Sequence, residues 1–433
     1  MVQLFTRANS LALTCLALAA AVYADKSDST SESSSSIKTS STTKTSTKTS
    51  SATAIATNLD FEVPEPFSAP GTNTSSGCGK ELDSDFDLDD TAGPFKFDTT
   101  DGYGRNYTIY IPKYYDFNKA SPLIFGLPGN TNTYEEIEEQ TELSDESNNP
   151  YAIAVYVSGV NLGFVSNPGY GATEDATFPK VDDLDFLNNF IDDLQDRFCI
   201  DTGRIWAVGH SNGAGLTNVL ACDPTLSTRI SVFAANSGAF YTNHTDGDAG
   251  SVDTDTTVQA ICSPGREHVP FIELHGTDDD TIPYDGADDH SSYGIRILPD
   301  IQHWASNWAV RNGYSTDSET SKPDDDVKVY QWGGPNNLGV VTHYELSGWG
   351  HDYARKSAGA PIDATPIIMK FFYEHTNYTE GSTKTSTTES IFTPTGASSA
   401  TATSAATVDR TAMPAAISFL AAFVGLAAAV LFY

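Results

Sequence analysis

A serine in the segment Gly209–Gly213 has the local sequence of an enzyme nucleophile. The segment reads Gly-His-Ser-Asn-Gly, and it lies between an apolar run, Ile205–Val208, and a helical run, Gly215–Ala221. In a sharp strand-to-helix turn, small flanking residues lift the serine hydroxyl above the carboxyl edge of a sheet. The pattern therefore predicts that Ser211 attacks a carbonyl carbon and that the amide of Asn212 faces the oxyanion that forms.

Three adjacent aspartates are candidates for the acid of such a site. Asp278, Asp279 and Asp280 follow the apolar run Phe271–Leu274 after a short His-Gly-Thr turn. A carboxylate just beyond a strand end lies at the same sheet edge as Ser211, where it can orient a histidine ring and stabilise its cation. Spacing alone does not choose among the three, because any one of them could be a solvated loop acid.

A histidine late in the chain is the candidate base. Among the nine histidines of the chain, His351 follows the apolar run His343–Leu346 and precedes the last helical run. A loop at that position is flexible enough to reach over the serine turn. The order serine, aspartate, histidine along the chain is the order found in α/β-hydrolases.

The elements that carry these residues alternate between strand and helix patterns. The runs that predict strands are Tyr107–Ile111, Leu123–Leu127, Ala152–Val157, Arg204–Val208, Ser231–Ala235, Pro270–Leu274 and Val340–Leu346. The apolar stripes that predict helices are Leu184, Leu187, Ile191, Leu194 and Phe198, then Trp304, Trp308 and Val310, then Ile367, Ile368, Phe371 and Phe372. Several strand runs lack alternation, which indicates burial on both faces. The order predicts a mostly parallel sheet with helices on both faces.

Four stretches resemble those of a known enzyme family. They are Cys199–Gly213, Leu220–Asp223, His275–Tyr284 and Asp363–Ile368. On these stretches the chain is similar to secreted esterases of the α/β-hydrolase superfamily. More narrowly, it resembles the fungal feruloyl esterases, acetylxylan esterases and polyhydroxybutyrate depolymerases of carbohydrate esterase family one. The resemblance implies the α/β-hydrolase fold and ester hydrolysis without a cofactor, but it does not fix the acyl group.

The resemblance also assigns roles to residues. The family pattern places the acid four residues after the histidine of the His-Gly pair, which is Asp279 here, beside Ser211 as nucleophile and His351 as general base. We also expect Trp349 and Tyr284 to contact the substrate.

The loop that supplies the second oxyanion donor departs from the family pattern. Where the family has His-Gly, this chain has Pro128-Gly129. Proline has no amide hydrogen, so Pro128 cannot donate. We therefore expect the second donor to be the backbone amide of Asn130.

The charge balance limits the possible partners. The chain has 24 Lys and Arg against 57 Asp and Glu, a net charge of −33. Such a chain cannot neutralise a nucleic-acid backbone, so we expect no nucleic-acid partner. The acidic stretches Asp83–Asp90 and Asp246–Asp255 lack the glycine and terminal glutamate of a calcium loop, so we expect solvated loops and no metal. We expect the protein to be a monomer and its substrate to be a polysaccharide ester.

Composition divides the chain into five predicted segments. They are a signal peptide (1–24), a Ser/Thr-rich linker (25–76), the folded domain (77–378), a Ser/Thr-rich stalk (379–404) and a GPI-attachment signal (405–433). We expect the Ser/Thr-rich segments to be disordered, because they cannot bury enough apolar surface. The uncharged tail Ala415–Tyr433 follows small residues and a short polar spacer, which is typical of GPI attachment at Ser404, with Ser399 as the second choice. An ordinary tail anchor is the alternative.

Export would permit disulfides and glycans. Without the signal peptide four cysteines remain, and we expect two disulfides among Cys78, Cys199, Cys222 and Cys262. Sequence does not choose among the three possible pairings. The N-glycosylation sequons begin at Asn73, Asn106, Asn243 and Asn377.

The sequence therefore predicts a secreted serine carboxylic-ester hydrolase, held at the plasma membrane or cell wall by a GPI lipid and acting on polysaccharide-linked esters. Feruloyl esterase is the first expectation, and acetylxylan esterase or polyhydroxybutyrate depolymerase is the alternative. A non-catalytic surface glycoprotein that retains the hydrolase fold is the alternative of another class.

Overall fold

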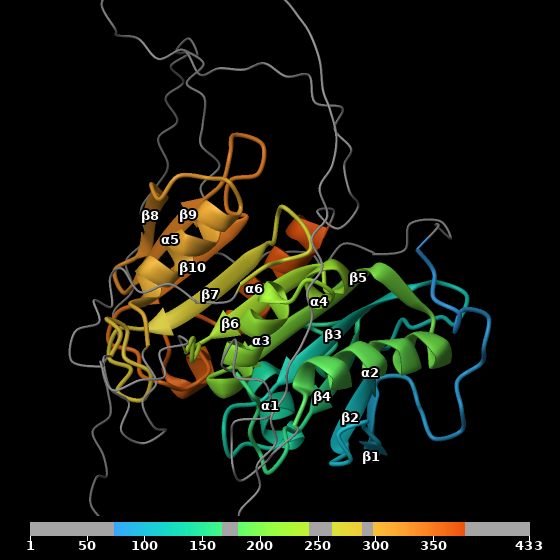
Figure 1. Ribbon diagram of the computed structural model, residues 1–433. Coiled ribbons are helices and arrows are strands. Elements are labelled where there is room, and N and C mark those ends of the chain that lie inside the picture. The colour runs from blue at the N-terminus through green and yellow to red at the C-terminus, as the bar shows by residue number, and fades with distance from the viewer. Residues whose placement is uncertain (1–72, 167–180, 242–261, 288–297, 377–433) are drawn as a thin grey trace, which may run out of the picture. The chain divides into compact units, whose positions relative to one another are not determined.

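Ten strands form one sheet in the order β1-β2-β4-β3-β5-β6-β7-β10-β9-β8 (Figure 1). The strands are β1 Asp90–Phe97, β2 Arg105–Ile111, β3 Ser121–Leu127, β4 Ile153–Val157, β5 Ile200–His210, β6 Val232–Asn236, β7 Phe271–Gly276, β8 Glu319–Asp324, β9 Val327–Trp332 and β10 Val341–Leu346. The neighbouring strands β4-β3-β5-β6-β7-β10 run parallel to one another. Antiparallel strands flank it on both sides. The prediction of a mostly parallel sheet is confirmed, and the fold is that of an α/β-hydrolase.

The computed structural model describes residues 73–166, 181–241, 262–287 and 298–376. The predicted signal peptide, stalk and GPI signal lie outside these ranges, as do residues 25–72 of the predicted linker. Within the described ranges, no helix is long and apolar enough to cross a membrane.

Helices cover both faces of the sheet. They are α1 Tyr134–Thr141, α2 Asp183–Arg197, α3 Asn212–Cys222, α4 Leu226–Arg229, α5 Ile301–Arg311 and α6 Ala364–His375, with a short 3-10 turn at Lys356–Ala358. Side chains of α2, α3 and α5 share one hydrophobic core with the sheet. Side chains of α1 and α6 share a second core with it. The sheet is thus buried between two layers, which explains why its central strands are apolar throughout.

The longest helix, α2, shows how the sequence specifies these layers. Phe186, Leu187, Phe190, Ile191 and Leu194 are buried and recur at the three- and four-residue spacing of one helical face. The helix begins after Asp182, whose carboxylate accepts a hydrogen bond from the amide of Asp185 at 2.9 Å.

The prediction missed some elements at the edges of the sheet. The outer strands β1 and β8 carry mostly exposed or half-exposed residues, so they lack the apolar signal of a buried strand. Val310, which we assigned to the buried stripe of α5, is 50% exposed. Its six-residue offset from Trp304 turns it to another face of the helix, because residues three or four apart share a face.

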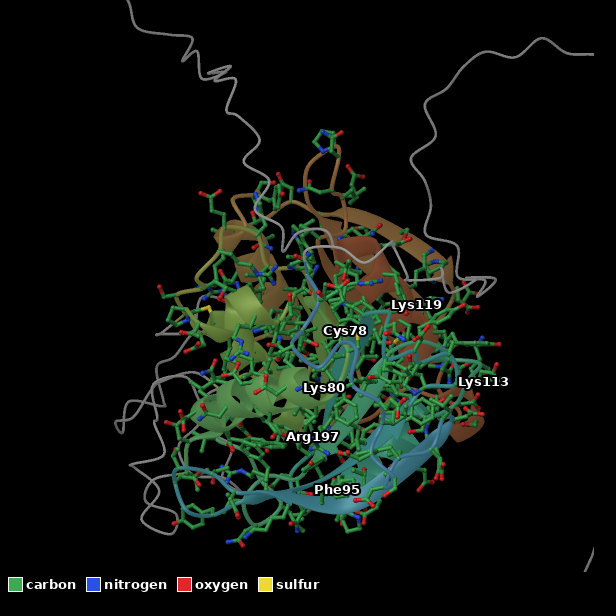
Figure 2. The ribbon with its side chains drawn as sticks, turned by 90° about the vertical axis from the view of Figure 1, so that its right-hand side faces the viewer. Cys78, Lys80, Phe95, Lys113, Lys119 and Arg197 are labelled. Atoms are coloured by element: carbon green, nitrogen blue, oxygen red, sulfur yellow. A yellow bond between two sulfur atoms is a disulfide. The ribbon has the colours of Figure 1, made fainter. Side chains whose placement is uncertain are left out.

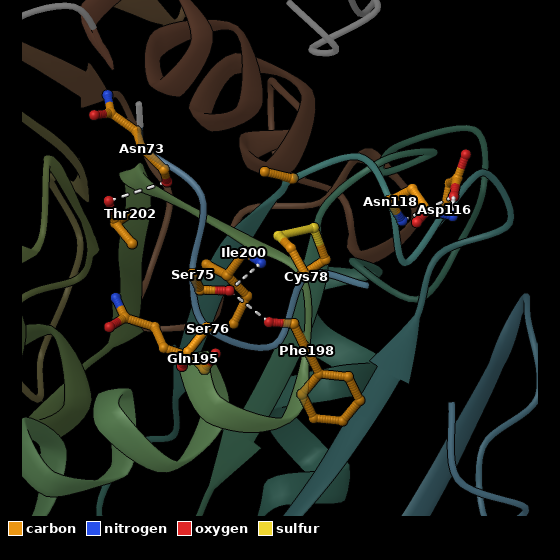
Figure 3. Close-up of a disulfide and its surroundings, with 12 residues drawn as sticks. Asn73, Ser75, Ser76, Cys78, Asp116, Asn118, Gln195, Phe198, Ile200 and Thr202 are labelled. Atoms are coloured by element: carbon orange, nitrogen blue, oxygen red, sulfur yellow. Dashed lines mark hydrogen bonds between the residues drawn. A yellow bond between two sulfur atoms is a disulfide. The ribbon is translucent and has the colours of Figure 1, made fainter. Parts of the chain in front are cut away.

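The segment 73–78, here called the strap, spans the predicted domain boundary and is part of the fold (Figure 3). The Ser75 hydroxyl donates to the carbonyl of Phe198 at 2.6 Å and accepts from the amide of Ile200 at 2.8 Å. Thr74 forms an isolated bridge with Asp201. The boundary that we predicted at Gly77 therefore falls inside a hydrogen-bonded segment.

Two disulfides tie the scaffold. Cys78 is bonded to Cys199, and Cys222 is bonded to Cys262. The first joins the strap to the start of β5, and Figure 2 shows Cys78 on the side of the molecule that also carries Phe95 of β1. Cys199 precedes β5 and Cys222 ends α3, so both disulfides involve the ends of these elements that lie away from Ser211.

Candidate active site

Ser211 forms a strained turn between β5 and α3. Its φ is 51° and its ψ is −116°, a backbone conformation that non-glycine residues rarely adopt. The two glycines that stand two positions before and after the serine have no room for side chains. A Cβ on Gly209 would lie 2.3 Å from the backbone of Gly213, and a Cβ on Gly213 would lie 2.1 Å from the carbonyl oxygen of Leu127. Both glycines are therefore required by close packing around the serine.

The structure brings Ser211, His351 and Asp279 into one hydrogen-bonded chain. Nε2 of His351 lies 2.9 Å from Oγ of Ser211, and Nδ1 of the same ring lies 2.8 Å from Oδ2 of Asp279. The Asp279 side chain is fully buried, whereas the His351 side chain is 20% exposed. This is the arrangement in which a histidine can take the serine proton while an aspartate holds the ring.

The geometry distinguishes Asp279 from its two neighbours. Its Oδ1 accepts hydrogen bonds from the amides of Thr281 at 2.9 Å and Ile282 at 2.8 Å. Burial alone would raise its pKa, but hydrogen bonds from His275 and His351 hold the pKa of Asp279 well below its usual range. Asp278 and Asp280 are exposed. Among the three aspartates, Asp279 is thus the one that is in contact with the histidine.

The loop after β3 lies against the nucleophile. A Cβ on Gly129 would lie 3.3 Å from Cβ of Ser211, so the loop that contains Asn130 passes directly beside the serine.

The Asn212 side chain accepts from the amide of Phe164 at 2.8 Å and donates to the Ser166 hydroxyl at 2.8 Å. This side chain anchors the loop that follows β4. The roles of the Asn130 and Asn212 amides as oxyanion donors stay predictions.

The two residues expected to contact the substrate have different surroundings. The Trp349 indole donates to the carbonyl of Asp352 at 2.8 Å, and its half-buried ring packs on the core beneath. The Tyr284 hydroxyl lies 2.9 Å from Nε2 of His343 and 3.3 Å from Oε2 of Glu345. That hydroxyl is thus in contact with two side chains of β10, and the substrate contacts expected of Trp349 and Tyr284 stay predictions.

The sequence did not predict two residues that position the backbone of the site. Nε2 of His210 is 2.8 Å from the backbone carbonyl of His351, and burial and the nearby His351 lower the pKa of His210 to about 4. Asn236 accepts from the amide of Ser211 at 3.0 Å with its carbonyl and from the amide of Ala354 at 2.8 Å with its side chain. The sequence signal for Asn236 is its position at the end of a predicted strand, where polar residues reach the same sheet edge as Ser211.

The remaining predicted sites divide between described and undescribed residues. Asn73 is partly exposed and Asn106 is exposed. Asn243, Asn377, Ser399 and Ser404 lie outside the described residues. In the part of the chain that the structure describes, no three His, Cys, Asp or Glu side chains are grouped so that they could hold a metal ion.

Comparisons with known proteins point to one group of enzymes. No family model matches the chain. Feruloyl esterase B of Piromyces equi is 25% identical over 251 residues, which cover 57% of this chain and 42% of that protein. A probable feruloyl esterase C of Aspergillus niger is 24% identical over 194 residues, covering 42% of this chain and 58% of that protein. The matches to these two relatives thus span less than two thirds of their lengths.

One more relative and two solved structures are also similar to this chain. A probable feruloyl esterase C of Aspergillus flavus is 28% identical over 226 residues, covering 51% of this chain and 67% of that protein. An acetyl xylan esterase from Aspergillus awamori matches with a TM-score of 0.44 and 15% identity, over 64% of this chain and 96% of its own. A ferulic acid esterase from Anaeromyces mucronatus matches with a TM-score of 0.35 and 16% identity, over 67% of this chain and 90% of its own. The strand order of the sheet shows the α/β-hydrolase fold, and in sequence the chain resembles the feruloyl esterases.

Proposed function

We propose that the chain is a serine carboxylic-ester hydrolase. The observation that carries this proposal is the hydrogen-bonded chain from Ser211 through His351 to Asp279. It is supported by the strained turn that holds Ser211 and by the sequence resemblance to feruloyl esterases.

The proposed reaction uses the residues of this chain alone. Ser211 Oγ bonds to the ester carbonyl carbon while its proton passes to Nε2 of His351, and the amides of Asn212 and Asn130 stabilise the oxyanion. The intermediate then collapses, and the alcohol leaves with the proton from His351. Water adds to the acyl-enzyme and gives a proton to His351. That proton returns to Ser211 as the carboxylic acid is released.

The proposed substrates are esters attached to polysaccharides, with feruloyl esters first. The curated relatives are named feruloyl esterases, which supports this order. Acetylated xylan and hydroxybutyrate oligomers are the alternatives.

The test of the proposed activity has two stages. Hydrolysis of a p-nitrophenyl ester by the wild-type chain, and not by Ser211→Ala, is the expected first result. Initial rates on methyl ferulate, acetylated xylan and hydroxybutyrate oligomers then identify the acyl group, with methyl ferulate expected to be fastest. Absence of hydrolysis on every substrate would instead favour the non-catalytic surface glycoprotein.

We also propose that the protein is exported and held at the cell surface by a GPI lipid. The support is compositional: a Leu- and Ala-rich run near the first residue, and the uncharged tail Ala415–Tyr433 after Ser404. Phosphatidylinositol-specific phospholipase C, with inositol deacylation if required, should release the protein from membranes. Detection of Ala415–Tyr433 peptides in the mature protein would contradict this proposal.

A further inference from the structure

A chain of buried ionisable side chains extends behind Asp279 into the sheet. Glu273 and His275 lie on β7, and His343 lies opposite Glu273 on the neighbouring strand β10. All three side chains are fully buried. The reaction proposed above uses none of them, and burying such groups costs free energy unless they are paired.

The hydrogen-bond partners of His275 favour a proton on each ring nitrogen. Nε2 of His275 lies 2.9 Å from the carbonyl oxygen of Ile282 and 3.2 Å from Oδ2 of Asp279. Both atoms only accept, so this nitrogen must carry a proton. Nδ1 lies 2.8 Å from Oε1 of Glu273, and a glutamate ionised at this site requires a proton there as well. Two donor nitrogens make the ring an imidazolium.

The electrostatics agree with this geometry. Burial lowers the pKa of His275, but the charge of Glu273 and the hydrogen bonds to both carboxylates outweigh it and raise the pKa to about 10. Burial raises the pKa of Glu273, but His275 and His343 together hold it below its usual value. Both shifts favour the charged form of each partner.

We propose that His275 is a buried imidazolium that positions Asp279 and shares its negative charge with His351, and that Glu273 keeps His275 charged. This inference rests on the proposed function, because it concerns the base of that reaction. Oδ2 of Asp279 faces the His351 ring at 2.8 Å and the His275 ring at 3.2 Å. A carboxylate shared by two cations stabilises each one less than it would stabilise a single cation.

The consequence concerns His351. Because His275 competes for Asp279, the carboxylate stabilises the protonated form of His351 less than an unshared carboxylate would. The other ionisable groups that face these two rings are His210 on β5, beside His351, and Tyr284 after β7, beside His275; His343 on β10 is in contact with Glu273 instead.

The outer part of the network supplies a matched control. Nδ1 of His343 lies 2.8 Å from Oε2 of Glu273 as an ion-pair contact, and its Nε2 lies 2.9 Å from the Tyr284 hydroxyl. Beyond Tyr284 lies Glu345, which accepts from the Tyr330 hydroxyl at 2.7 Å. Glu345 lies opposite His275 on the paired strand, but the described hydrogen bonds and ion pairs of its side chain go to Tyr284, Tyr330 and Lys328 and not to His275 or Asp279.

The test is Glu273→Gln, which keeps the shape of the side chain but removes the charge that holds His275 protonated. His275 then becomes neutral, and the acid limb of kcat/KM, which reports His351, should move to higher pH by about one unit. The shift is upward because the variant removes the positive charge that shares Oδ2 of Asp279 with His351. Glu345→Gln should leave the limb where it is in the wild-type protein.

A purely structural role for Glu273 would give a different result. The melting temperature of Glu273→Gln would fall while the acid limb stayed in place, and that outcome would overturn the proposal. An equal shift in Glu345→Gln would also overturn it, because the effect would then not depend on His275.

A second measurement does not depend on catalysis. In the full chain labelled with ¹⁵N-histidine, the His275 ring should show two protonated nitrogens at pH 8, with its signal assigned by its loss in His275→Gln. A neutral His275 ring in the wild-type protein would overturn the inference even if Glu273→Gln failed to fold. The same spectra give the His351 titration directly in wild type and Glu273→Gln. An upward shift there, in a protein that hydrolyses no ester, would support this inference while the proposed function failed.

Discussion

Two buried clusters of charge lie in different parts of this fold, and they differ in what surrounds them. At one side Arg105 on β2 is paired with Asp183 at 2.9 Å and with Asp101 at 3.0 Å, and all three side chains are at most 3% exposed. Near the centre, Glu273, His275 and Asp279 form the second cluster. The first contains a guanidinium that never loses its proton, whereas the second contains imidazoles and is in contact with the half-buried His351.

This difference suggests separate roles for the two clusters. The Arg105 guanidinium joins β2 to the first turn of α2, and Asp183 also accepts from the amide of Val165 at 2.8 Å. These contacts hold elements together and place no titratable group near the nucleophile. The second cluster ends at the hydrogen bond between His351 and Ser211. We therefore expect the first cluster to control stability and the second to control the rate and its pH dependence.

The largest expected effect tests whether catalysis belongs to the second cluster. Ser211→Ala should lower turnover of a p-nitrophenyl ester by about 10⁴- to 10⁶-fold, because the members of a triad act as a unit. The melting temperature should change little, since the variant removes only one hydroxyl. Full activity in a folded Ser211→Ala protein would remove the basis of the esterase proposal.

The next effect tests the assignment of the acid. Asp279→Asn should lower kcat by up to about 10⁴-fold, because an amide cannot hold His351 in the tautomer that accepts the serine proton. Asp278→Asn and Asp280→Asn are the matched controls, and both should retain near wild-type rates because these side chains are exposed. If Asp280→Asn were the crippling change, the acid assignment would be wrong.

The first cluster should respond in stability instead. Arg105→Met leaves Asp101 and Asp183 without their cation in a buried site, which should lower the free energy of unfolding by about 3–5 kcal/mol. Lys113→Met is the matched control, since it removes an exposed pair with Glu146 and should cost at most about 1 kcal/mol. Denaturant unfolding measures both values. A loss of kcat in folded Arg105→Met as large as that of Asp279→Asn would break the separation between the clusters.

The sequence predicted part of the second cluster and none of the first, for a physical reason. Ser211, Asp279 and His351 each follow a strand, so their shared sheet edge could be predicted from the order of elements alone. Glu273 and His343 lie inside apolar strand runs, and their contact depends on β7 pairing with β10, which no local pattern encodes. The pairing of Arg105 with Asp183 likewise joins residues 78 positions apart. Motif and periodicity thus predicted the residues at strand ends but not the pairs between elements.

The smallest expected effect sharpens the comparison through pH. Burial raises the pKa of Asp101, but hydrogen bonds from Thr99, the Tyr103 amide and Arg105 outweigh it and hold the pKa at about 2. A carboxyl whose pKa is lowered by folding stabilises the protein above its unfolded value, near 3.8, and this contribution is lost as the pH falls toward 2. The difference in melting temperature between wild type and Asp101→Asn should therefore be largest at pH 5 and above, and should shrink as the pH approaches 2.

The control for this pH dependence is an aspartate near Asp101 in sequence. Asp98, in an exposed pair with Lys96, has a side chain that is 89% exposed, so Asp98→Asn should give a curve that runs parallel to wild type. Catalysis provides the second half of the comparison, since Asp101→Asn should leave the acid limb of kcat/KM in place while Glu273→Gln moves it. A difference between wild type and Asp101→Asn that stayed constant down to pH 2 would mean that the Asp101 carboxylate is not what stabilises this cluster. A shifted acid limb in the same variant would mean that the two clusters are electrostatically coupled.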